Sequence, residues 1–381
     1  MGVRAAMLRS VAARPAVLLV TVPGGTGARL AAERELRQRD LPVALTPAGA
    51  DILLVAGRPA PALADAVDRL WRDIAAPRAR ADVRDAGEVA TALDTCAVRL
   101  SDPAGHLSAP GADAREARVR HGGLPMAAPG EDRDGLTLDR LHVPLGPLLA
   151  DWPAGLVVRL ALQGDVVQRA DVDGGVAAHG PPFWSEPWLR AAAGEDVTVG
   201  AAARRRAAAH LDSLGRFLAV AGWPSQATVA RRLRDGLLMG SETTRLRREV
   251  HGFSRRVGRS RTLYWLTRGP GELTQGQARD AGVEGPAARA GADVPARYRQ
   301  WLADVERDLS RLDDPAPLDP SVDRGPRGRA DGTRRPSAAL VEVLPRMLAG
   351  AELAAARLIV ASLDPDPDEY GSRPVGAVAG G

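Results

Sequence analysis

The stretch AVLLVTVPGGTG, residues 16–27, decides the fold of the first part of the chain. It joins a short apolar run rich in β-branched residues, Ala16–Val22, to a turn, Gly24–Gly27, that holds three glycines. A segment of helical composition follows, and the pattern then repeats with an apolar run at Asp51–Ala56 and an apolar-faced segment at 60–76. Strand, helix, strand and helix in this order predict an α/β domain with a parallel, flavodoxin-like sheet.

The glycine turn leaves two interpretations open. A turn between a strand and a helix can bind phosphate through its backbone amides. This one lacks the Lys-Ser/Thr pair of a P-loop and does not fit the GxGxxG pattern. It indicates either a nucleotide-binding enzyme built on the first domain or a tight strand–helix turn without a ligand.

Composition predicts two domains and two inserts. We place the first domain at 1–100, a linker or arm rich in glycine, proline and charge at 101–135, and the second domain at 136–381. Within the second domain, residues 315–336 have the composition of a disordered insert.

The second domain is predicted to be mainly α-helical, with a small antiparallel β-hairpin at its start. Two strand-like runs, Gly155–Leu162 and Val166–Val172, are separated by a short polar turn. Residues 176–200 are predicted to form a loop, and helices follow from residue 201 onward. The last helix is expected to span 337–363, with Pro345 kinking or breaking it.

Residue usage excludes several classes of protein. The single cysteine, Cys96, excludes an intramolecular disulfide framework and a zinc site built on three or four thiolates. The net charge is only +4 and aromatic residues make up 3%, which argues against a nucleic-acid-binding protein. No pair of histidines has zinc-ligand spacing, and no G-x-S-x-G is present. No apolar run approaches membrane-spanning length, so we expect a cytoplasmic protein without a signal peptide.

Four carboxylates are concentrated in SLDPDPDE, residues 362–369, after the last predicted helix. Pro365 and Pro367 favour an extended backbone there. The segment holds no cysteine, so it offers no thiolate ligand for an iron–sulfur or nickel–iron centre. Two interpretations remain: a solvated acidic end, or a site in which Asp364 or Glu369 faces a cleft between domains as a proton-linked carboxylate with a raised pKa.

Several stretches of the second domain resemble, in family order, the large, quinone-site subunit of respiratory complex I and the related large subunit of nickel–iron hydrogenases. GLVVRLALQGDVVQRAD at 155–171, preceded by Gly146-Pro147, resembles the family's opening hairpin. RRRAAAHLDSLGRFLAVAG at 204–222 is similar to its R-I-A-N-H-L helix. Residues 261–271 with 276–291 resemble its R-T-x-G and T-G-P segments, and IVASLDPDPDE at 359–369 resembles its closing motif.

The first domain resembles the companion small subunit, so the two subunits look fused in this chain. The resemblance rests on the first strand, the GGTG turn and ADILLVAG at 50–57. Thr26 and Ala28 stand where that subunit carries cluster cysteines, and Asp366 and Glu369 stand where the hydrogenase motif has cysteines. None of these four residues provides the sulfur ligand that such a centre needs. The resemblance therefore implies a degenerate subunit without a metal centre.

The resemblance implies a subunit of a complex I-like or energy-converting-hydrogenase-related membrane complex, with the coding bias of an actinobacterium. Its role would be structural or quinone- and proton-coupling, without independent catalytic activity. This chain is expected to bind no cofactor of its own, and whether it binds quinone is left open. Iron–sulfur clusters are expected only in partner subunits. The expected partners are membrane proton-translocating subunits and iron–sulfur proteins, and the expected location is the inner face of the cell membrane.

Trp152, Asp364 and Glu369 are the residues predicted to line a quinone-type or proton-coupling pocket where the two domains meet. Trp152 lies where the family's opening histidine is expected, and this chain has no histidine there. The alternative hypothesis is a soluble scaffold or interaction protein that retains only the fold. The presence or absence of neighbouring genes for antiporter-type membrane subunits would discriminate the two.

Overall fold

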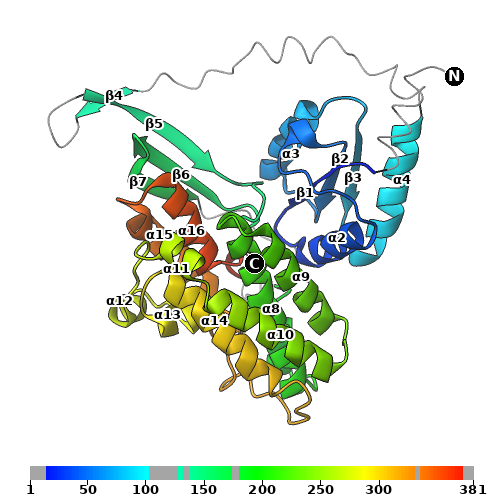
Figure 1. The fold of residues 1–381 in the computed structure, drawn as a ribbon, viewed down its shortest axis with the longest axis vertical. Helices are drawn as coiled ribbons and strands as arrows, with labels where there is room; N and C mark the ends of the chain where they lie inside the picture. Colours follow the sequence, from blue (N-terminus) through cyan, green and yellow to red (C-terminus); the bar gives the residue numbers. More distant parts are fainter. Residues whose placement is uncertain (1–13, 103–127, 132–136, 174–179, 331–334, 372–381) are drawn as a thin grey trace, which may run out of the picture. The chain divides into compact units, whose positions relative to one another are not determined.

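The computed structural model describes residues 14–102, 128–131, 137–173, 180–330 and 335–371, which belong to two compact units (Figure 1). One unit comprises residues 1–128 with 147–150, and the other comprises 129–146 with 151–381. Each unit is described separately below. None of the helices in the described part is long and apolar enough to cross a membrane.

The first unit is an α/β domain, as predicted. Its parallel sheet has the order β1-β2-β3, with Val17 opposite Ile52 and Ile52 opposite Ala79. Helices alternate with the strands because each parallel connection needs a crossover. The elements are β1 (Val17–Thr21), α2 (Thr26–Gln38), η1 (Pro47–Gly49), β2 (Ile52–Ala56), α3 (Pro61–Asp73), β3 (Ala79–Val83), η2 (Ala86–Glu88) and α4 (Val89–Ser101).

The core of the first unit is apolar. All five residues of the central strand β2 are buried, as its unbroken hydrophobic run predicts. Cys96 is part of this core, and burial raises the pKa of its thiol. Gly25 in the glycine turn packs against the end of β2, where a Cβ atom would lie 2.1 Å from the Ala56 carbonyl oxygen. Close packing alone therefore explains this glycine.

The second unit begins with a four-stranded sheet of order β4-β5-β6-β7, in which β5, β6 and β7 pair antiparallel. The predicted hairpin is present as β6 and β7, and Gly164 adopts the left-handed conformation that its tight turn requires. The strands are β4 (Ala128–Glu131), β5 (Thr137–Leu145), β6 (Val157–Gln163) and β7 (Val166–Asp173).

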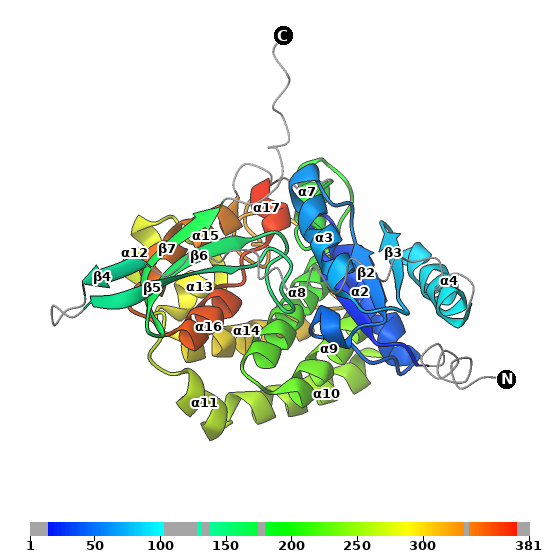
Figure 2. The same ribbon diagram turned by 90° about the horizontal axis from the view of Figure 1, so that it is seen from above.

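Helices form the rest of the second unit. The long helix α8 begins after Thr198, whose hydroxyl caps it by accepting a hydrogen bond from the Ala201 amide. It packs against α9, α14 and α16, which places it in the centre of the helical layer (Figure 2). The helices are α7 (Glu186–Ala192), α8 (Val199–Val220), α9 (Pro224–Leu238), α10 (Thr243–Gly258), α11 (Arg261–Thr267), α12 (Gln275–Asp280), α13 (Gly285–Ala290), α14 (Val294–Leu309), α15 (Pro336–Leu348), α16 (Leu353–Leu363) and α17 (Pro367–Gly371).

Two predictions about these helices differ from the structure. Helix α7 lies inside the predicted loop 176–200. The helix predicted at 337–363, with a kink or break at Pro345, is divided into α15 and α16 a few residues beyond that proline. The division falls after Pro345, at Gly350, where the backbone is left-handed. There the chain pairs with the hairpin: the Gly350 amide donates to the Val167 carbonyl, and the Val167 amide donates to the Ala351 carbonyl, both at 2.8 Å. Tertiary hydrogen bonds thus replace helical ones.

Candidate functional site

The closing segment SLDPDPDE lies in the interior of the second unit. Asp364 ends α16 in the left-handed conformation, with φ of 47°, and turns the chain inward. Asp364 is only 4% exposed, and so is Glu369. Asp366 and Asp368 are also buried. The interpretation of this segment as a solvated acidic end is therefore wrong.

Two arginines hold Asp364. Arg327 Nη2 lies 2.6 Å from Asp364 Oδ2, and Arg327 Nε donates to the Asp364 carbonyl oxygen at 2.6 Å. Arg216 of α8 lies 2.6 Å from Oδ1, and the Ser213 hydroxyl donates to Oδ2 at 2.5 Å. We call Asp364, Asp366 and Glu369 with Arg216 and Arg327 the carboxylate–arginine cluster. Charge-assisted bonds of this kind are the strong ones in protein interiors.

Glu369 is held by hydroxyl groups. Ser185 donates to its Oε1 at 2.6 Å and Ser337 donates to its Oε2 at 2.5 Å. Burial raises the pKa of Glu369, and the nearby Arg327 offsets this only in part. Burial raises the pKa of Asp366 in the same way. Both carboxyl groups are thus shifted toward the protonated form.

Arg327 is the cation that the three carboxyl groups share. Burial lowers its pKa, but the charges of Asp364, Asp366 and Glu369 raise it by more, so Arg327 stays charged. Its Nη1 lies 3.6 Å from Asp366 Oδ2, and neither atom has a hydrogen-bond partner among the described residues. Gly285, at the start of α13, makes room for this loop, because a Cβ there would lie 2.4 Å from the Arg327 carbonyl oxygen.

Buried charges continue from this cluster along α8. Arg216 also lies 3.4 Å from Asp212, which forms an ion pair of 2.6 Å with Arg234 of α9. Asp212 and Arg234 are both fully enclosed. Alternating charges therefore connect α9, α8 and the closing segment.

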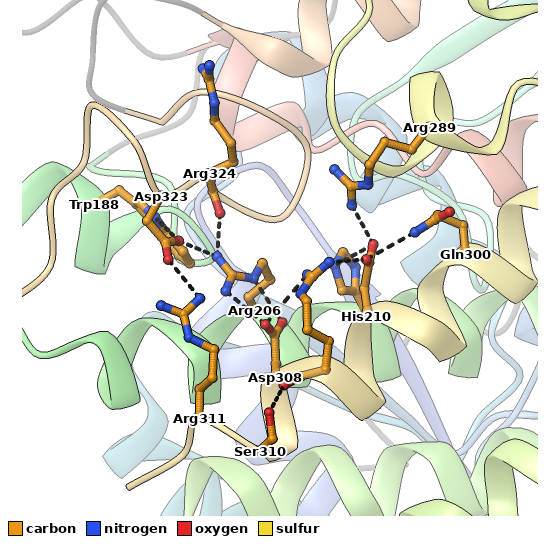
Figure 3. Close-up of polar contacts among 12 residues, drawn as sticks. Trp188, Arg206, His210, Arg289, Gln300, Asp308, Ser310, Arg311, Asp323 and Arg324 are labelled. Atoms are coloured by element: carbon orange, nitrogen blue, oxygen red, sulfur yellow. Dashed lines mark hydrogen bonds and ion pairs between the residues drawn. The ribbon is translucent and has the colours of Figure 1, made fainter. Parts of the chain in front are cut away.

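A second buried ionic cluster lies nearer the start of α8 (Figure 3). Arg206 binds Asp308 of α14 through two parallel hydrogen bonds of 2.8 Å. It also pairs with Asp323, which Arg311 approaches at 3.2 Å. Asp304, one turn before Asp308, binds Arg289 and Arg307. These contacts hold α8, α14 and the loop after α14 together.

His210 of α8 lies among the residues of this second ionic cluster (Figure 3). Its Nε2 lies 3.9 Å from Asp304 Oδ2 and has no hydrogen-bond partner in the described part of the chain. Burial lowers the pKa of His210 to about 3, so the imidazole is neutral at physiological pH. His210, Ser213, Arg327 and Asp364 all line one small pocket.

This pocket is too small for a quinone ring. The space that the centre of a water molecule can occupy in it is about 10 Å³, which is enough for about one water. Among the described residues, no group of three or more His, Cys, Asp or Glu side chains is placed to hold a metal ion. The groups available for chemistry here are the carboxyl groups of Glu369 and Asp366, whose pKa values burial raises, and the arginine-bound carboxylate of Asp364.

The structure brings together two of the three predicted site residues. Asp364 and Glu369 belong to the carboxylate–arginine cluster. Trp152 lies between β5 and β6, and its indole Nε1 donates to the Leu156 carbonyl at 2.8 Å. No hydrogen bond or ion pair joins Trp152 to the cluster within the described ranges. The predicted quinone or proton-coupling role of the three residues stays a prediction.

Sequence reasoning missed the arginines that define the cluster. Arg327 lies in the stretch expected to be a disordered insert, yet its side chain is buried. A signal for the polar line on α8 does exist: Arg206, His210 and Ser213 follow each other at i, i+4 and i+7 within a helix that is otherwise rich in alanine and leucine. That spacing puts them on one face.

The segments that the resemblance singled out converge on the closing helix and its C-terminal end. Helix α8 contributes Ser213 and Arg216 to the cluster, as described above. The hairpin accepts a hydrogen bond from the first residue of α16, Leu353, at the Asp165 carbonyl. The segment at 261–271 is joined through Arg297, which donates to the Gly271 carbonyl at 2.7 Å and to the Ser362 hydroxyl at 3.0 Å. The segment at 276–291 contains Gly285, packed against Arg327.

Comparisons with known proteins do not assign a family. No family model matches the chain, and no curated protein gives a significant match. Among solved structures, the chain is similar to a chain of the membrane-bound sulfane sulfur reductase, an archaeal respiratory membrane complex. The identity is 16%, the TM-score is 0.43, and the match covers 61% of this chain and 98% of that chain.

Proposed function

We propose that this chain is a structural subunit of a membrane-associated redox complex of the complex I and energy-converting-hydrogenase class. In this role it carries no metal centre of its own and docks on partners that do: iron–sulfur proteins and membrane proton-translocating subunits. It works as a peripheral subunit at the inner face of the membrane.

The observation that carries the proposal is the convergence on the closing segment. The four other stretches of the second domain were singled out by resemblance in sequence alone, and they are up to about 200 residues away from it along the chain. In the fold they all contact α16, its C-terminal end or Arg327 of the cluster at that end. A chance resemblance of scattered short motifs has no reason to gather at one place.

The cluster itself favours a structural role over catalysis. Both oxygens of Asp364 are bound by arginine, and both oxygens of Glu369 are bound by serine. Buried polar groups with well-placed partners fix one arrangement of the elements that contribute them. The cluster thus holds α8, α15, α16 and the loop containing Arg327 in one geometry, as a metal centre would in a catalytic relative.

Affinity purification of the tagged chain from its native membranes, followed by mass spectrometry and electron paramagnetic resonance, tests the proposal. We expect co-purification of iron–sulfur proteins and antiporter-like membrane subunits, with cluster signals that come from those partners. A chain recovered alone and without such signals would overturn the proposal and leave the soluble scaffold.

Two substitutions separate assembly from proton coupling. Asp364→Asn removes a charge that two arginines need, so we expect less assembled complex and unchanged turnover per assembled complex. Glu369→Gln keeps an acceptor for one serine and removes the titrating group. A loss of turnover in Glu369→Gln at normal assembly would assign Glu369 to proton transfer and contradict a purely structural role.

A further inference from the structure

Positive charge is concentrated in α10, α11 and their flanking residues. Between Glu242 and Arg268 there are eight arginines and only two glutamates. This segment alone therefore has a net charge of +6, whereas the whole chain has +4. Such a concentration produces a local positive field that the overall charge conceals.

Helix α10 presents part of this charge as a stripe. Its buried residues recur at i, i+4, i+7 and i+11 and pack on the rest of the unit: Leu246, Val250, Phe253 and Val257. Arg248, Arg255 and Arg259 follow the same spacing about 200° away around the helix, and all three are exposed. One face of α10 is thus apolar and buried, and the opposite face is basic and open.

Helix α11 adds an exposed apolar pair. Trp265 is 59% exposed and Leu266 is 65% exposed, side by side in the sequence. Arg261 and Arg268 lie four residues before and three residues after Trp265, on the same face, and the Arg268 guanidinium stacks over the indole ring at 3.9 Å. Only Arg259 and Ser260 separate this helix from α10, and both helices follow one edge of the second unit in Figure 2.

The arginines of this surface are available to a partner. Arg248, Arg255, Arg256, Arg259 and Arg261 form no ion pair with any residue in the described part of the chain. Some exposed arginines elsewhere, such as Arg169 and Arg190, are paired with carboxylates. The charges near α11 are therefore not neutralised by the fold.

We propose that the α10–α11 surface binds the surface of an anionic phospholipid membrane. The arginines would contact lipid phosphates, and Trp265 with Leu266 would enter the headgroup region. Tryptophan prefers this interface, and basic side chains gain from the negative surface potential. The phosphates of a nucleic acid could contact these arginines equally well, but a nucleic acid provides no apolar layer into which the exposed Leu266 could insert. This surface is separate from the carboxylate–arginine cluster. The proposal deepens the membrane location proposed above, and its test uses the purified chain alone, so it can fail while the assembly with partner subunits holds.

Flotation of the purified full-length chain with vesicles tests the proposal. We expect binding to vesicles of equal parts phosphatidylglycerol and phosphatidylcholine, loss of binding in high salt, and no binding to phosphatidylcholine alone. The triple variant Arg255→Gln, Arg259→Gln, Arg261→Gln should weaken binding on the order of 100-fold, since each arginine near such a surface contributes roughly five-fold.

A matched control removes the same charge elsewhere. Arg58→Gln, Arg69→Gln, Arg84→Gln changes three exposed arginines of the first unit and should leave binding within about two-fold. Equal losses in both triple variants would reduce the effect to net charge and overturn the assignment of the surface. The absence of binding to anionic vesicles in the native chain would also overturn it.

Brominated phosphatidylglycerol gives a second readout. Bromine quenches tryptophans that enter the lipid, so we expect partial quenching in the native chain and none in Trp265→Phe, which keeps an apolar ring. If quenching persists in Trp265→Phe, a different surface enters the membrane. If a duplex oligonucleotide binds more tightly than vesicles and depends on the same three arginines, the partner is a nucleic acid and the proposal is wrong.

Discussion

The two units of this chain are built on different kinds of core. In the described part of the first unit, no polar or charged residue is buried, and its central cluster consists of aliphatic side chains with Cys96. The second unit encloses four arginines: three are paired with carboxylates, and Arg297 is bonded to backbone carbonyls and the Ser362 hydroxyl. The buried charged residues are Arg206, Asp212, Arg234, Arg297, Asp304, Asp308, Arg327, Asp364, Asp366, Asp368 and Glu369.

This difference between the two cores determines which substitutions each of them tolerates. Apolar burial is non-directional, so a core such as the first one tolerates substitutions that keep volume. A buried charge is tolerated only with a well-placed partner, and removing that partner leaves an uncompensated charge. The second unit therefore depends on particular pairs, and the following variants test this contrast from the largest expected effect to the smallest.

Removing Arg327 should have the largest effect. Arg327→Met leaves Asp364, Asp366 and Glu369 buried without their shared cation, and we expect a loss of about 3–5 kcal/mol in the free energy of unfolding. Urea unfolding followed by tryptophan fluorescence measures it, because six of the seven tryptophans belong to the second unit. Arg324→Met, three residues away and half exposed, is the control. Equal stability of the two variants would contradict a dependence on this pair.

Opening a cavity in the first core should lower the free energy of unfolding somewhat less. Leu54 is fully buried in β2, and Leu54→Ala should lower stability by about 2–5 kcal/mol through lost burial and a cavity. Hydrogen exchange of peptides from residues 17–101 reads this unit separately. Leu45→Ala, at an exposed leucine, should change stability by less than about 0.5 kcal/mol. A tolerated Leu54→Ala would show that this core is loosely packed.

His210 should give the second unit a pH dependence that an apolar core lacks. Its folded pKa of about 3 lies below the unfolded value near 6.5, so the unfolded chain binds the proton first as the pH falls. Stability should therefore decrease between pH 6.5 and pH 3, by at most about 1.4 kcal/mol per pH unit from this residue. The difference in unfolding free energy between native chain and His210→Gln, followed over this range, isolates the contribution. A pH-independent difference would mean that His210 is accessible to protons in the folded state.

Removing a surface ion pair of the first unit should have the smallest effect on the free energy of unfolding. Arg39 pairs with Asp94 and Glu35 at partly exposed positions, and Arg39→Ala should cost at most about 1 kcal/mol. Thermal unfolding followed by circular dichroism, or hydrogen exchange of the first unit, measures this loss of stability at low and at high salt. A loss as large as that of Arg327→Met would remove the distinction between enclosed and exposed arginines.

The fold was largely predictable where hydrophobic pattern determines it. The strands at 17–21 and 52–56, the hairpin around Gly164 and the helix over 294–309 all agree with their periodicity. The short helix at 186–192 was missed because two prolines and several glycines around it indicate a loop. The last helix was predicted to kink or break at Pro345. Nothing local shows that the break lies instead at Gly350 and Ala351, which pair with β7.

The candidate site was predictable only in part. Asp364 and Glu369 were predicted as site residues because several carboxylates occur together in a short motif. The same motif is equally typical of a solvated acidic end. Their burial follows from Arg327, 37 residues earlier, and from Arg216 on α8. Trp152 was chosen by position in a motif, and its indole is bonded within its own loop.

The sequence by itself determined the α/β and helical character of the two units, the absence of thiolate ligands apart from Cys96, and the order of the motifs along the chain. Local periodicity and residue chemistry are sufficient for these features. Only the tertiary structure decided that the closing carboxylates are buried and that Arg327 neutralises them. Charges attract through space rather than along the chain, so no local pattern records which arginine will be brought to which carboxylate.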